Sequence, residues 1–79
     1  MARDYTINRV VHDYIRLNDI KQEWLSRTTG IENYRLSRII NSKAPLWADD
    51  LFLILKATGM PVQLLIDAIQ NGEGGESNE

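Results

Sequence analysis

The 79-residue sequence contains no cysteine, one histidine, two prolines and no long apolar run. Without cysteine, the chain has no disulfide framework, no thiolate nucleophile and no zinc site of the Cys/His type. Its apolar runs fall far short of the roughly 20 residues that a membrane span requires. The first residues, Met-Ala-Arg-Asp-Tyr-Thr, form no apolar segment of the signal-peptide type. We therefore expect one small cytoplasmic domain with no membrane association.

Side chains suited to catalysis are equally scarce. His12 is the only histidine, and its spacing places it on the exposed side of an expected first helix, where solvation is the simplest interpretation. Asp49 and Asp50 are adjacent, so on a helix they point about 100° apart, a poor arrangement for sharing a proton or a metal. The segment 72–75, Gly-Glu-Gly-Gly, lacks the flanking strand and helix of a phosphate-binding loop. We expect no enzymatic activity, no metal and no cofactor.

Apolar residues recur at intervals of three and four, which predicts helices rather than strands. The expected elements are a first helix that closes at Leu17, helices over 22–28 and 33–40, a fourth helix between Asp49 and Gly59, and a fifth that begins near Pro61. On the fourth helix, Phe52 is expected to face inward with its apolar neighbours. The fold class is therefore an all-α, compact five-helix domain over residues 1–70. Residues 71–79 form a polar, acidic tail that we expect to be disordered.

The second and third of these helices meet at Gly30. Glycine readily adopts the left-handed conformation that a three-residue turn requires. Leu25, Ile31, Leu36 and Ile39 are the apolar positions that two steeply crossing helices share. This layout is typical of a helix-turn-helix, whose second helix enters the major groove of DNA.

The distribution of charge is compatible with that interpretation. The chain has a net charge of −2, yet residues 21–43 hold five basic and two acidic side chains. The other acidic residues lie outside this segment, among them Asp49-Asp50, Asp67 and those of the tail. A locally positive segment, rather than the total charge, is what predicts contact with nucleic acid.

The run from Ile20 to about Leu65 resembles the lambda-repressor-like DNA-binding domain, the Cro and phage-repressor or XRE-type family. The residues that carry the resemblance are Gln22, Leu25-Ser26, Thr29-Gly30-Ile31, Leu36-Ser37-Arg38-Ile39, Asn41 and Leu55-Lys56-Ala57-Thr58-Gly59-Met60. The resemblance implies a helix-turn-helix at helices 2 and 3, a homodimer on a near-palindromic double-stranded DNA operator, and a role as a transcriptional repressor or regulator. Lys21 and Glu32 depart from it, because the family has Ser or Thr at these two N-cap positions.

The outward face of the helix over 33–40 is expected to read bases. Its polar residues fall within an arc of about 140° opposite the apolar ones; they are Asn33, Tyr34, Ser37 and Arg38. Asn pairs with adenine, Arg with guanine and Ser with either, while Tyr contacts a thymine methyl group or a phosphate. An exposed helix face is polar in any case, so the prediction depends on the preceding hinge. Residues expected to contact phosphates are Lys21, Gln22, Arg35, Asn41 and Lys43.

Two further surfaces predict contact with protein. Val62, Leu65 and Ile69 of the fifth helix are expected to form a dimer interface. Trp24 and Trp47 are expected outside the deep core, where they either fold over its edge or anchor a protein partner. These tryptophans and the acidic tail motivate an alternative function, a protein-binding module of the same fold such as an antitoxin or an inhibitor of a host protein.

Overall fold

A computed structural model describes residues 5–73, which form five α-helices and a π-helical segment and contain no β-strand. The elements are α1 (Thr6–Leu17), α2 (Gln22–Thr29), α3 (Asn33–Ile40), α4 (Ala48–Thr58), α5 (Val62–Ala68) and η1 (Ile69–Glu73). The predicted all-helical class is thus confirmed for the described residues. The helical backbone continues to Glu73, past residue 71, where the acidic tail was expected to begin; residues 74–79 of that tail lie outside the described part.

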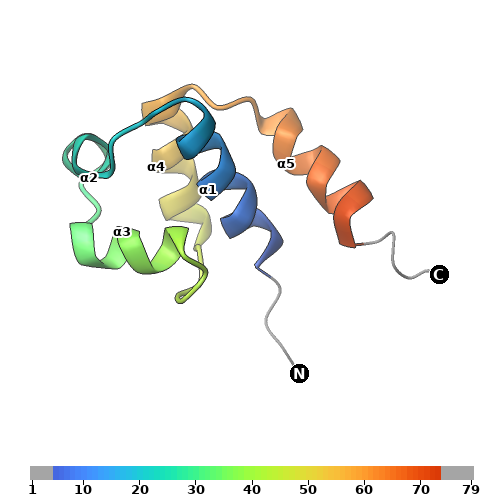
Figure 1. The fold of residues 1–79 in the computed structure, drawn as a ribbon, viewed down its shortest axis with the longest axis horizontal. Helices are drawn as coiled ribbons and strands as arrows, with labels where there is room; N and C mark the ends of the chain where they lie inside the picture. The colour runs from blue at the N-terminus through green and yellow to red at the C-terminus, as the bar shows by residue number, and fades with distance from the viewer. Residues whose placement is uncertain (1–4, 74–79) are drawn as a thin grey trace.

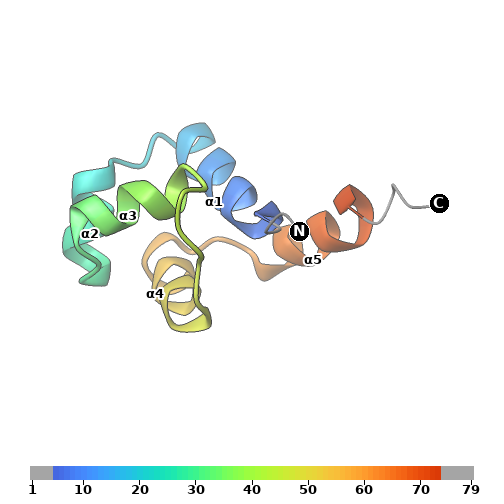
Figure 2. The same ribbon diagram turned by 90° about the horizontal axis from the view of Figure 1, so that it is seen from below.

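The helices are arranged with α2 and α3 at one end of the molecule and α5 at the other (Figure 1). The view turned by 90° shows the same separation (Figure 2). Helix α1 connects the two ends, since it contacts α3, α5 and η1, while α2 packs against both α3 and α4. A ligand on the outer side of α3 and a partner on α5 would therefore occupy different ends of the protein. None of the described helices is long and apolar enough to cross a membrane.

The core lies where these helices cross. The four apolar positions that the helix-turn-helix pattern predicted to be shared are all buried. The other core residues are Val11, Ile15, Ile40, Ile54, Met60 and Leu65. The two crossing helices thus pack against the rest of the domain as well as against each other, α2 against α4 and α3 against α1, which fixes α3 to the body of the domain.

The expectation that Phe52 faces the core is wrong. Its side chain is 61% exposed, and the Nζ atom of Lys56 lies 5.6 Å from the centroid of its ring. Leu51, Ile54 and Leu55 form the inward stripe of α4 instead. Phe52 is about 160° around the helix from Ile54, which is fully buried, so its side chain points away from the core.

Helices α2 and α4 end in the same way. Thr29-Gly30-Ile31 terminates α2 and Thr58-Gly59-Met60 terminates α4. Each threonine hydroxyl donates to the carbonyl four residues earlier, at 2.7 and 2.8 Å, and accepts from the N–H two residues later, at 3.1 and 3.2 Å. The glycines have φ of 84° and 73°, in the left-handed region that glycine adopts at low cost. The chain reverses after each helix and inserts the following apolar residue into the core.

Candidate nucleic-acid interface

Helix α3 has one polar and one buried side, as its sequence predicts. Leu36, Ile39 and Ile40 are buried. Asn33, Tyr34 and Arg38 are exposed, Tyr34 with 69% of its surface accessible, and Ser37 is half-buried. The structure therefore brings the four expected base-reading residues to the outer side of a single helix.

The first of these residues, Asn33, is tied to the start of α2. The Nε2 atom of Gln22 donates to Oδ1 of Asn33 at 2.8 Å and to its backbone carbonyl at 3.3 Å. The expected contact of Gln22 with phosphate stays a prediction, while the structure shows that Gln22 orients the neighbouring amide. An amide oxygen has two lone pairs, so Oδ1 of Asn33 can accept a second hydrogen bond while its amino group donates.

The other end of α3 is closed by several hydrogen bonds. The Lys43 N–H donates to the Arg38 carbonyl at 2.7 Å, and Ser42 N–H donates to the Ile39 carbonyl at 3.2 Å. Arg38 returns a bond from Nη2 to the Lys43 carbonyl at 2.8 Å, and Nδ2 of Asn41 bonds the Ser37 carbonyl at 2.9 Å. This pattern is a Schellman motif, and Ser42, with φ of 60°, stands at the left-handed position that usually holds glycine. Asn41 and Lys43 are exposed there.

Arg35 points toward α4 rather than along the polar face. Its Nη2 donates to Oδ2 of Asp50, a carboxylate in the first turn of α4 whose side chain is only 10% exposed. The pair joins α3 to α4. The expected contact of Arg35 with phosphate stays a prediction, and the structure adds a partner within the protein.

Sequence reasoning missed Asn8, whose side chain holds the far end of α3. Asn8 lies on α1, is 4% exposed, and its Nδ2 atom donates to the carbonyls of Ile39, at 2.9 Å, and Ala44, at 3.0 Å. The spacing of Asn8 could have indicated this position, because Asn8 precedes Val11 by three residues and Ile15 by seven and so falls on the same side of the helix. An asparagine in the buried stripe of a helix must find hydrogen-bond partners there.

At the N-terminal ends of the two helices, Lys21 and Glu32 occupy the N-cap positions that the sequence assigned to them. Neither side chain makes a capping hydrogen bond. Both residues are exposed, and neither side chain satisfies the first N–H groups of its helix. These uncapped groups and the Lys21 ammonium lie at the edge of the polar face, where an anion can approach.

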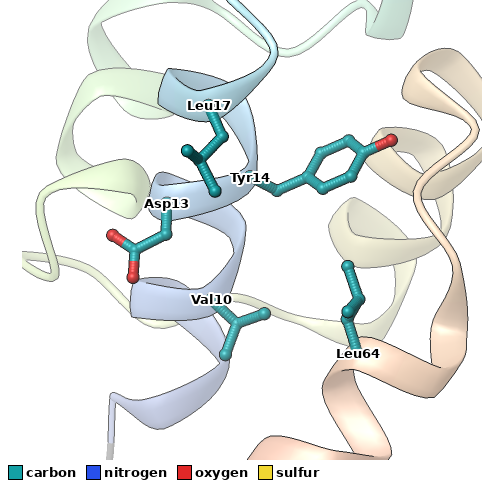
Figure 3. Close-up of a pocket in the computed structure, with 5 residues that line it drawn as sticks. All are labelled: Val10, Asp13, Tyr14, Leu17 and Leu64. Atoms are coloured by element: carbon teal, nitrogen blue, oxygen red, sulfur yellow. The ribbon is translucent and has the colours of Figure 1, made fainter.

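The surface expected to mediate dimerisation needs one correction. Leu65 is 4% exposed and belongs to the core, so its side chain is not available to a partner, whereas Val62 and Ile69 are each 56% exposed. Helix α5 also borders an open groove of about 200 Å³, which lies between α1 and α5. Figure 3 shows Val10 and Tyr14 of α1 on the side that faces Leu64 of α5; the lining residues are Val10, Asp13, Tyr14, Leu17 and Leu64.

Aromatic side chains mark another surface. Trp24 and Trp47 lie outside the deep core, as expected, and are 41% and 60% exposed. Between α2 and α4 there is a second open groove of about 210 Å³. Its lining residues are Thr28, Leu53, Lys56 and Ala57.

The residues considered for catalysis are not assembled into a site. His12 is half-buried rather than exposed, and its Nδ1 lies 3.1 Å from Oδ1 of Asp13. Within residues 5–73, no group of three or more His, Asp or Glu side chains is arranged to hold a metal ion.

Comparison of the chain with protein-family models, with curated proteins and with solved structures found no match.

Proposed function

We propose that this protein is a sequence-specific DNA-binding transcriptional regulator, a repressor of the phage or mobile-element type, with the lambda-repressor-like fold. Helices α2 and α3 are then the helix-turn-helix, and α3 reads the major groove of an operator. The observation that supports this most strongly is the outer side of α3, where Asn33, Tyr34 and Arg38 are exposed together. These side chains have the hydrogen-bonding and apolar groups that distinguish base edges in the major groove.

The hydrogen bond between Gln22 and Asn33 favours adenine as one of the bases read. Bidentate recognition of adenine requires an acceptor for its N6 amino group and a donor for N7. Oδ1 of Asn33, with its second lone pair, and the Nδ2 group supply both. Because Gln22 already orients this amide, less side-chain entropy is lost when the base binds.

Arg38 has N–H groups left with which to read a guanine. One of its five N–H groups donates to the Lys43 carbonyl, which leaves four for O6 and N7 of the base. Phosphates on either side of the groove would be bound by Lys21 and Gln22 at the start of α2 and by Asn41 and Lys43 after α3. Such contacts fix the register of the protein without reading sequence.

Dimerisation through α5 would place two α3 helices on the two halves of a near-palindromic operator. Val62 of α5 and Ile69 at the start of η1 are exposed, and α5 lies at the end of the molecule opposite α2 and α3 (Figure 1). Joining two copies there leaves both polar faces free. The interface would be isologous, so that each copy presents the same apolar surface to the other.

A chemical-shift titration tests which surface meets DNA. Uniformly ¹⁵N-labelled protein is titrated with a mixed-sequence duplex at about 0.05 M salt, where sequence-independent binding is strengthened. We expect the largest changes at the amides of α3 and in the side-chain amide signals of Gln22 and Asn33. The indole N–H signals of Trp24 and Trp47 should stay in place. Changes confined to α4 and α5, or no change, would contradict the proposal.

A second candidate function, a protein-binding module such as an antitoxin or an inhibitor of a host protein, is favoured by the aromatic surface. Trp47 and Phe52 are exposed on or beside α4, and Trp24 is partly exposed on α2. Large aromatic side chains frequently anchor protein interfaces. In this case the indole signals would move on addition of the partner, and α3 would not respond to DNA.

A further inference from the structure

We propose that Asn8 is a positioning residue that holds the α3–α4 loop in place for contact with DNA phosphates, an inference that rests on the proposed function. Its side chain is buried on α1. The Nδ2 group has two hydrogens, and both are used, toward the carbonyls of Ile39 and Ala44. One amide therefore bonds two points that lie 31 and 36 residues away in the sequence.

The two bonds enclose the segment that carries the expected phosphate contacts. Ile39 is in the last turn of α3 and Ala44 is in the following loop, so residues 40–43 lie between them. This interval contains Asn41 and Lys43. The bonds within the loop, such as that from Lys43 N–H to the Arg38 carbonyl, tie it only to α3. Among the donors named here, only Asn8 bonds the residues on both sides of this interval, Ile39 and Ala44, and so joins them to α1.

The loop has a local reason to need this restraint. Ser42 has φ of 60°, a left-handed conformation that is unfavourable for residues other than glycine. Without the bonds from Asn8, the backbone of residues 41–44 gains access to more relaxed conformations. Asn41 and Lys43 would then be distributed over several positions relative to α3.

Loss of these positions should affect the phosphate contacts and not the bases, because Arg38 stays on an anchored helix and loses only its hydrogen bond to the Lys43 carbonyl. Each phosphate contact contributes about 0.9 to the slope of log K against log salt concentration. Asn33 lies at the opposite end of α3 and is held by Gln22, so its preference for a base should persist. The Asn8→Ala variant should therefore bind all duplexes more weakly by the same factor, with a salt slope that is shallower by about 1–2.

The experiment compares Asn8→Ala with the control Thr58→Val. Thr58 also makes two hydrogen bonds through its side chain, but it lies at the turn after α4 and outside the polar face. In free protein, ¹⁵N order parameters of residues 41–44 should fall toward about 0.6 in Asn8→Ala and stay near about 0.85 in the control. Salt-dependent binding is then measured with a selected duplex and a mixed-sequence duplex. If Asn8→Ala does not fold, Asn8→Ser, whose single O–H can satisfy one carbonyl at most, is used instead.

The outcomes separate this inference from the proposed function. Unchanged loop order, or a looser loop with an unchanged salt slope, overturns the role of Asn8 alone. A larger loss on the selected duplex than on the mixed-sequence duplex also overturns it, because Asn8 would then support base reading. A wild-type chain that binds no duplex overturns the proposed function and the phosphate role together, while the order parameters still report whether Asn8 holds the loop.

Discussion

Replacing Lys21 with serine should raise stability and lower DNA affinity at the same time. Lys21 is the N-cap of α2, has the extended backbone of a cap (φ −79°, ψ 134°) and makes no capping bond. A serine hydroxyl there can accept from the N–H of Glu23 or Trp24, which typically stabilises by about 1 kcal/mol. Removing a cation from the positive end of the helix dipole raises the free energy of unfolding by about 0.3–1 kcal/mol more. The total of roughly 1.5 kcal/mol corresponds to a rise in Tm of roughly 6–12 °C for a domain of this size.

The effect on DNA has the opposite sign, because the ammonium that would bind a phosphate is lost. We expect weaker binding to every duplex and a salt slope shallower by about 0.9. Lys21→Ala is the matched control: it removes the same charge without providing an acceptor, so it should lose the same affinity and gain only the dipole contribution to Tm. Thermal unfolding and salt-dependent fluorescence anisotropy measure the two quantities. An unchanged or lower Tm for Lys21→Ser would refute the capping argument, and unchanged affinity would refute the phosphate contact.

Five further substitutions, in three sets, test the geometry. Ser42→Gly should raise the urea midpoint by relieving the left-handed residue of the Schellman motif, a gain of about 0.5–1 kcal/mol; a lower midpoint would contradict this. Arg35→Ala should lower the free energy of unfolding more than Asp50→Asn does. Arg35→Ala leaves the nearly buried Asp50 carboxylate without its partner, whereas in Asp50→Asn the Arg35 guanidinium still reaches water. Equal losses of stability in chemical unfolding would argue against the pair. Leu65→Asp should unfold the domain. Val62→Asp should keep the circular dichroism of the wild type and halve the mass measured by sedimentation, and an unchanged mass would contradict the dimer interface.

The features predicted correctly from the sequence are those that depend on residues close together in the chain. The period of apolar residues predicted the bounds of the helices over 22–29 and 33–40 to within one residue. Gly30 marked the turn because its left-handed conformation is a local requirement. The buried and exposed sides of α3 follow from the same periodicity, which is why Asn33 and Arg38 are found on the expected side.

The features that the sequence could not supply depend on distant partners. The acceptors of Asn8 lie more than 30 residues away, and the partner of Arg35 became known only when α4 was placed against α3. Leu65 was misassigned because α5 carries apolar residues on several sides, so its pattern does not show which side meets α1. Phe52 was misassigned for a similar reason, since α4 has more apolar residues than its inward stripe can hold.

The central claim, that α3 reads a specific sequence, is tested most directly by selection from a randomised duplex pool at about 0.15 M salt. Wild-type protein is compared with the Asn33→Ala/Arg38→Ala variant and with Lys56→Ala/Gln63→Ala, which removes an amide and a cation away from α3. We expect wild type and the control to enrich the same near-palindrome and the α3 variant to enrich none. Enrichment of that motif by the α3 variant, or of no motif by wild type, would contradict the account.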